Sequence, residues 1–368
     1  MGTLAEMLST PLGVIEWFVY LLAAVMFVIG LHLMNSPKTA RKGNMVSAIG
    51  MVFAVAMAFI VLFAGEASNG FKHGVAVIVL IVGIVIGAVA GVVSAKKVKM
   101  TDMPQLVSVF NTVGGGAAAL VALNDILTSA ETPSIVVLIT AGLGIMIGSV
   151  TFSGSLIAAG KLQGIKWVKK LSLPGKGFWN ILFVVLTIVS FVMLCVQPNQ
   201  RLLWSILTTV FALCYGLVFV IPIGGADMPV VISVLNACTG TAVAMSGLAI
   251  NNIALIVAGA LVGAAGVTLS IAMSKAMNRP LLSVLAGGFG GSNAAAGAGE
   301  GPEGTMKETS ADDLAVQLVY AEKVIFVPGF GLAQAQAVSS PTLARCSRTT
   351  ASKSPTPSTR LPAVCRAI

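Results

Sequence analysis

The chain has 368 residues, of which 57% are hydrophobic and only 10% are charged, and its mean hydropathy is +0.97. A soluble domain carries about 25% charged residues, so this composition excludes a soluble globular protein and predicts a polytopic membrane protein. The net charge of +9 follows the loops between apolar runs, and we interpret it as a sign of membrane topology and not of nucleic-acid binding. The five cysteines show no metal-ligand spacing, so no metal site is predicted.

Apolar runs of membrane-spanning length follow one another along the first three quarters of the chain. A transmembrane helix needs about 20 apolar residues, and these runs predict an all-α membrane bundle of about nine helices over residues 1–273. The third run contains Gly83, Gly87 and Gly91 at the spacing by which membrane helices pack closely, so we expect it to pack on another helix. In chain order the runs cover residues 12–34, 43–64, 74–95, 104–128, 134–159, 178–196, 202–222, 228–250 and 252–273.

Basic residues are unevenly distributed among the loops. The loops after spans two, four, six and eight contain only Lys72 and Arg201, and the short loop after span seven contains no cation. The loops after spans one, three, five and nine contain Lys38, Arg41, Lys42, Lys96, Lys97, Lys99, Lys161, Lys166, Lys169, Lys170, Lys176, Lys275 and Arg279. The positive-inside rule then places the N-terminus outside and the C-terminus in the cytoplasm of a bacterial inner membrane, or in the matrix of an organelle.

One polar pattern occurs twice. TDMPQLVSVFNTVGGGAAALVAL (101–123) opens span four, and ADMPVVISVLNACTGTAVAMSGL (226–248) opens span eight. Both spans enter from the same predicted side, so the repeat is parallel. VTFS (150–153) and VTLS (267–270) echo each other in the spans that follow, which indicates a duplicated helical hairpin.

An asparagine lies at the same depth in each copy. Asn111 and Asn236 each follow a serine by three residues, so Ser and Asn share a helix face. A side-chain amide in hydrocarbon is costly unless it has a partner. Two matched faces predict a polar seam, which serves either as a water-holding proton or ion path or as interhelical hydrogen bonding.

Asp102 and Asp227 each stand before Met-Pro at the start of a repeat copy. Asp is a good N-cap, and Pro suits the first helical turn. The two carboxylates therefore either cap their helices or lie at the cytoplasmic mouth of a pathway, where they respond to a docked domain.

The segment after span nine changes in character. Residues 274–309 are rich in Gly and Ala and predict a flexible linker. Residues 310–336 begin with an amphipathic helix pattern and continue with VIFVPGFG (324–331), a strand that runs into a Gly-x-Gly turn. Such a turn is how an α/β, Rossmann-like nucleotide-binding domain begins, because its glycines let the backbone approach a pyrophosphate.

Taken together, these segments resemble the beta subunit of the proton-translocating NAD(P)+ transhydrogenase. The resemblance covers most of residues 12–336 and rests on KKVKMTDMPQLVSVFNTVGGGAAALVAL, GSVTFSGSLIAAGKLQG, GGADMPVVISVLN, KAMNRPLLSVLAGGFG and VIFVPGFGLAQAQ. It implies a membrane domain coupled through a linker to an NADP(H)-binding domain. It also implies an alpha-subunit partner that binds NAD(H), a dimer of protomers, and hydride transfer of the Si-specific/Re-specific type driven by proton passage.

The resemblance also implies roles for individual residues. The proton-pathway candidates are Asn236, Asn111, Asp227, Ser153 and Ser155, and either serine can correspond to the serine of the family's channel. Some family members have a histidine at the position of Asn111. The cofactor-binding candidates are Pro328, Gly329, Phe330, Gly331 and Ala333.

The end of the chain departs from the family pattern. Residues 337–368 form a Ser/Thr/Pro/Arg mixture without helix or strand periodicity, and we hypothesise that they are a frameshifted, disordered tail. On that hypothesis the NADP(H) domain is incomplete and this chain alone is inactive. Two alternatives stay open: a secondary transporter with its substrate site between spans four and eight, or a structural membrane subunit.

Overall fold

The computed structural model describes residues 11–64, 70–99, 102–129, 133–165, 168, 175–277 and 280–287. The chain divides into two compact units, Met1–Ala296 and Gly297–Ile368, and every described residue belongs to the first. The described residues form helices and turns without a strand. The expected nucleotide-binding segment 310–336, with Pro328, Gly329, Phe330, Gly331 and Ala333, and the tail 337–368 lie outside them.

Within the described ranges, nine helices are long and apolar enough to cross a bilayer, which confirms the predicted bundle. They are α2 (Pro11–Met34), α3 (Ala40–Ala64), α4 (Gly70–Lys97), α5 (Met103–Thr128), α6 (Ile135–Leu162), α8 (Lys176–Val196), α9 (Arg201–Val220), α10 (Met228–Ala249) and α11 (Ile253–Ala276). Three short elements accompany them: η2 (Pro198–Gln200), η3 (Gly225–Asp227) and α12 (Leu281–Gly287). The helix α12 lies inside the segment that the composition predicted as a flexible linker.

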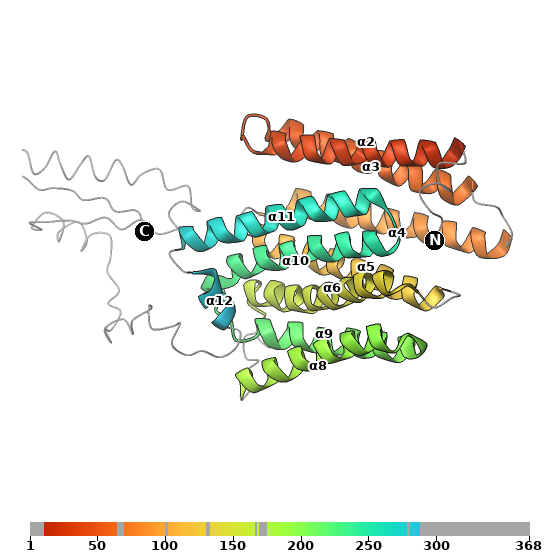
Figure 1. The fold of residues 1–368 in the computed structure, drawn as a ribbon. Coiled ribbons are helices and arrows are strands. Elements are labelled where there is room, and N and C mark those ends of the chain that lie inside the picture. Colours follow the sequence, from red (N-terminus) through yellow and green to blue (C-terminus); the bar gives the residue numbers. More distant parts are fainter. Residues whose placement is uncertain are drawn as a thin grey trace, which may run out of the picture. The chain divides into compact units, whose positions relative to one another are not determined.

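Neighbouring helices in the chain pack as hairpins: α2 with α3, α5 with α6, α8 with α9, and α10 with α11. The helix α6 packs on α5, α9 and α10, and therefore joins three of the four hairpins. In Figure 1 the α8–α9 hairpin lies on one side of α6 and the α10–α11 hairpin on the other. The α2–α3 hairpin meets the rest through the contact of α2 with α11.

The hairpins α5–α6 and α10–α11 are the two copies of the sequence repeat, and their first helices run in the same direction. Asn111 of α5 contacts Ile232 and Thr239 of α10, whereas Ala118, further along α5, accepts a hydrogen bond from Ser246, further along α10. Residue numbers rise together on both helices. The structure therefore agrees with a parallel repeat.

Each copy closes through glycine. A Cβ on Gly148 of α6 would lie 2.6 Å from the carbonyl oxygen of Gly115 on α5. A Cβ on Gly240 of α10 would lie 2.3 Å from the backbone nitrogen of Gly263 on α11. Real Cβ atoms do not approach other atoms this closely, so a glycine is required at these crossings, as in small-residue packing between membrane helices.

The glycines of α4 behave differently. A Cβ on Gly83, Gly87 or Gly91 would meet nothing within 4 Å. No residue in an apolar 18-residue window of α4 is buried. The packing expected for this Gly-x-x-x-Gly face therefore has no counterpart within the described part of this chain.

A cluster of buried apolar residues closes the end of the bundle where α6 and α9 finish and α10 begins. We call this end of the bundle the Asp227 end. Its members include Ile157 of α6, Val220 of α9, Met228 of α10 and Val284 of α12. The short helix α12 is thus fastened to the same cluster as the start of α10.

Candidate functional site

Buried hydroxyl and amide side chains connect the two repeat copies. We define the polar seam as six chosen polar residues on the helices of the two repeat copies, each of which is at most 8% exposed. They are Ser108, Asn111, Ser155, Ser233, Thr239 and Ser270. They lie on α5, α6, α10 and α11, so the polar seam follows the centre of the duplicated unit.

Asn111 joins the first copy to the second. Its side-chain Nδ2 donates to the carbonyl oxygen of Ile232 at 3.3 Å, and its own backbone carbonyl accepts from Thr239 Oγ1 at 3.5 Å. Ile232 precedes Asn236 by one helical turn, and Thr239 follows Asn236 by three residues. The amide of Asn111 therefore lies against the same stretch of α10 that carries Asn236.

In the first copy, Ser108 Oγ of α5 donates to the carbonyl oxygen of Ser155 on α6 at 2.7 Å. The hydroxyl of Ser155 itself is completely buried and has no hydrogen-bond partner among the residues that the structure describes. An unsatisfied buried polar group costs about 1–3 kcal/mol. The place beside Ser155 Oγ is thus one where a partner such as a water molecule would be stabilised.

In the second copy, the serines form a closed set. Ser233 Oγ of α10 donates to the carbonyl oxygen of Gly266 on α11 at 3.3 Å. Ser270 Oγ lies 3.0 Å from Ser233 Oγ and 2.7 Å from the same carbonyl oxygen. Both copies therefore use the serine before their asparagine to bond across their own hairpin.

Asn236 differs from its repeat counterpart. Its side chain is half-buried, whereas Asn111 is 4% exposed. Within the described ranges the side-chain amide of Asn236 makes no hydrogen bond. Of the two matched side-chain amides, only that of Asn111 therefore forms an interhelical hydrogen bond.

The candidates Ser153 and Ser155 lie on different faces of α6. Ser153 Oγ donates to the carbonyl oxygen of Ser149, one turn earlier in the same helix, at 3.2 Å. A Cβ on Gly216 of α9 would lie 2.2 Å from Ser153 Oγ. Ser153 thus faces α9, whereas Ser155 belongs to the α5 side through Ser108. Of the two serines, only Ser155 is part of the polar seam.

The two aspartates occupy the N-cap positions of their helices, as expected. Asp102 precedes α5 and Asp227 precedes α10, but neither carboxylate makes the side-chain capping bond. Both residues have ψ angles near zero, 3° for Asp102 and −7° for Asp227, instead of the extended backbone of a typical cap. The side-chain bond that the capping interpretation requires is therefore not formed. Asp227 lies at the start of the helix that carries Asn236.

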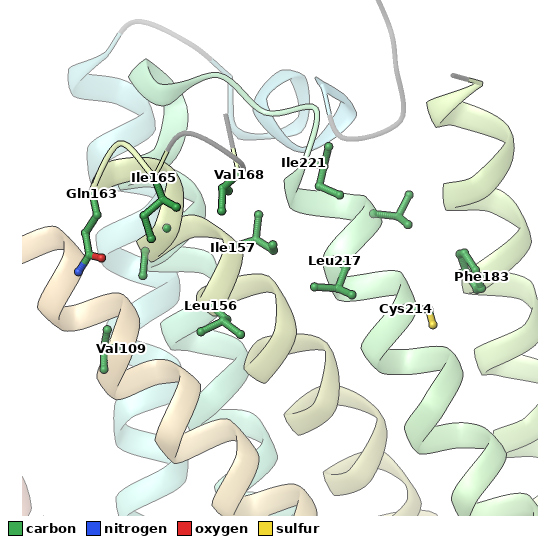
Figure 2. Close-up of a pocket in the computed structure, with 13 residues that line it drawn as sticks. Val109, Leu156, Ile157, Gln163, Ile165, Val168, Phe183, Cys214, Leu217 and Ile221 are labelled. Atoms are coloured by element: carbon green, nitrogen blue, oxygen red, sulfur yellow. The ribbon is translucent and has the colours of Figure 1, made fainter. Parts of the chain in front are cut away.

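A cavity of about 580 Å³ opens beside α6, away from the polar seam. Figure 2 shows Leu156 and Ile157 of α6 between Val109 of α5 and Leu217 of α9. None of the polar-seam residues lines this cavity, and its lining is almost wholly apolar. It suits an apolar occupant and offers no chain of polar groups for a proton.

Sequence reasoning missed the threonines of the site. Thr112 Oγ1 bonds to the carbonyl oxygen of Ser108 at 3.0 Å, and Thr239 contacts Asn111. Thr239 follows Asn236 by three residues and so shares its helix face, and this spacing could have identified Thr239 as a candidate site residue.

Comparison with known proteins gives a consistent result. Residues 16–344 match the family model described as NAD(P) transhydrogenase beta subunit. A curated NAD(P) transhydrogenase subunit beta from Rhodospirillum rubrum is 40% identical over 327 residues, which cover 86% of this chain and 68% of the relative. The corresponding protein of a named Rhodospirillum rubrum strain matches with the same identity and coverage.

Proposed function

Because the chain belongs to the family of NAD(P) transhydrogenase beta subunits, we propose that its polar seam carries protons across the membrane during hydride transfer between NADH and NADP+. The chain is a multi-pass membrane subunit of a proton-translocating transhydrogenase. The hydride chemistry belongs to the nicotinamide cofactors, so the work of this subunit is to couple proton passage to that chemistry.

The unpartnered hydroxyl of Ser155 is the observation that carries the proposal. It is fully buried at the α5–α6 interface, next to the Ser108 bond. A buried water typically makes about three hydrogen bonds to such polar groups. Because none of the six seam residues is ionisable, protons would pass along water held by serine, threonine and asparagine side chains.

Asn236 and Asp227 extend the pathway along α10. The half-buried amide of Asn236 is free to bind water, one turn from the carbonyl that Asn111 holds. Asp227 lies at the start of the same helix and supplies the nearest carboxylate in the chain sequence. A proton would enter or leave at Asp227 and pass the Asn236 amide on its way to the polar seam.

Coupling to the cofactor is supported by the position of α12. This helix comes shortly before the C-terminal unit in the chain sequence, and Val284 is 3% exposed within the cluster at the Asp227 end. A change in the C-terminal unit can reach the start of α10 through that contact. NADP(H) would be held by Pro328, Gly329, Phe330, Gly331 and Ala333, and NAD(H) by the alpha-subunit partner.

The remaining features of the proposal follow from the loop charges and the family. The N-terminus lies outside and the C-terminus in the cytoplasm of a bacterial inner membrane. The complex is a dimer of protomers, and its hydride transfer is of the Si-specific/Re-specific type. The transporter and structural-subunit alternatives have no comparable support, because the family match covers residues 16–344.

The test uses inverted membrane vesicles that contain the subunit, with a complete NADP(H)-binding domain restored, together with its alpha partner. NADPH formation from NADH is followed while respiration maintains a proton gradient, with and without an uncoupler. We expect the uncoupler to lower the rate, since the gradient drives the reaction. A rate that is indifferent to the uncoupler would count against proton coupling.

A further inference from the structure

The ammonium group of Lys161 binds the end of a neighbouring helix. Lys161 is in the last turn of α6, and its Nζ donates to the carbonyl oxygens of Val220 at 3.3 Å and Ile223 at 2.9 Å. It also donates to the carbonyl oxygen of Ile221. Sequence reasoning had counted this lysine only as a loop charge.

Helix polarity explains the contact. The last carbonyl groups of a helix have no partner within the helix and carry the negative end of its dipole. A lysine placed there satisfies them and gains a charge-assisted hydrogen bond. In this structure the lysine belongs to α6, and the carbonyl groups belong to the last residue of α9 and the residues just after it. One side chain therefore links the α5–α6 hairpin to the α8–α9 hairpin.

The bonded carbonyls belong to the segment that leads into α10. The amide of Ile223 bonds to Val220, and the amide of Asp227 bonds to Gly224, each at 3.2 Å. A Cβ on Gly224 or Gly225 would meet nothing within 4 Å, so these two exposed glycines have room around them. The α9–α10 turn, which we define as residues 220–227, is thus bonded to α6 through its first half and continues through Gly224 and Gly225 to Asp227.

We propose that Lys161 is a positioning residue for the proton-coupled reaction. Its ammonium fastens the α9–α10 turn to the end of α6, so that Asp227 and the start of α10 keep a fixed position relative to Ser155. Any movement of the turn then reaches α6 directly. This inference rests on the proposed function, because it needs protons to pass between α6 and α10.

The contact itself can be measured without activity. Hydrogen–deuterium exchange of the purified full chain in lipid nanodiscs would compare the native protein with Lys161→Met, Lys161→Arg and Lys275→Met. Lys275 is the matched control, because it is an exposed lysine in the last turn of the equivalent helix α11. We expect Lys161→Met to speed exchange in residues 220–227 about tenfold, and the other two variants to leave it unchanged.

The role in the reaction needs a second readout. In the assembled complex, with the NADP(H)-binding domain restored, Lys161→Met should lower the proton-coupled kcat at least about tenfold while the KM values for both nucleotides stay within about twofold. Lys161→Arg should restore the rate, because guanidinium also donates to carbonyl groups. Lys275→Met should match the native protein.

Each contrary result overturns the inference. Unchanged exchange in Lys161→Met would show that the ammonium does not hold the turn. Faster exchange in Lys161→Met with an undiminished proton-coupled rate would show that Lys161 is only a structural residue. A Lys161→Arg variant that restores protection from exchange but not the rate would show the same, and so would one that restores neither. A native rate that ignores the uncoupler would instead refute the proposed function and leave the exchange result standing.

Discussion

Asn111 of α5 donates a hydrogen bond to the carbonyl oxygen of Ile232 on α10, one turn before Asn236, its own counterpart in the repeat. The two asparagines therefore hold different positions although the sequence presents them alike. Asn111 fastens the two copies together, and the amide of Asn236 makes no bond within the described residues. We infer that Asn111 combines an interhelical bond with its place in the polar seam, whereas the amide of Asn236 is left to bind water.

Replacing each asparagine by leucine should separate these roles. Asn111→Leu removes an interhelical bond, and bonds of this kind contribute about 0.6–1.7 kcal/mol in membranes. It should lower thermal stability in detergent by a corresponding amount. Asn236→Leu should leave stability unchanged and abolish the proton-coupled rate in vesicles, and retention of the full rate would argue for a packing role.

The two serines of α6 allow a second matched pair. Ser155→Ala removes a buried hydroxyl that has no partner among the described residues, so the variant should lose no stability. The proton-coupled rate should nevertheless fall at least about tenfold, because the water site is lost. Ser153→Ala, whose hydroxyl bonds within its own helix, should keep the rate within about twofold. Equal effects of both variants on the rate would contradict this assignment.

Glycine substitutions should distinguish closed from open helix faces. Gly240→Ala places a methyl group 2.3 Å from the backbone of Gly263, so it should separate α10 from α11 and strongly reduce the yield of folded subunit. Gly87→Ala on α4 meets no atom within 4 Å and should be tolerated by the subunit alone. Yield and monodispersity in size-exclusion chromatography measure both. A well-folded Gly240→Ala protein would show that the close crossing of α10 and α11 is wrong.

The anchoring of α12 gives a fourth prediction. Val284→Ala removes buried methyl groups at the Asp227 end and should cost on the order of 1–2 kcal/mol of local stability. Hydrogen exchange in residues 281–287 should then be faster, and coupling in vesicles weaker. Leu282→Ala is the control, because Leu282 is 80% exposed. If both variants behave alike, α12 does not transmit changes through Val284.

The bundle could be predicted from the sequence because a bilayer imposes length and apolarity on each span. All nine runs became helices, and TDMP and ADMP marked the starts of α5 and α10, respectively, in the parallel orientation found. Bounds shifted where polar residues continued a helix, as at Arg41 and Lys42 in α3. The predicted domain bounds after residue 287, including the cofactor-binding turn and the tail, stay predictions.

The site could be predicted only in outline. Spacing placed Ser and Asn on one face, but it could not tell that Asn111 would reach Ile232 and that Asn236 would not be bonded. That difference depends on how α5 and α10 rotate against each other, which a pattern within one helix does not contain. For the same reason, Lys161 gave no sign that it would bind the end of α9.

The α8–α9 hairpin has a consequence for how such a protein can arise. Two copies of a helical hairpin that share one orientation must be separated by an even number of crossings. A single inserted helix would have turned the second copy upside down. The α8–α9 pair leaves from the side where α6 ends and returns to the side where α10 begins. Gene duplication followed by loss of either helix would thus have destroyed the alignment of the two copies.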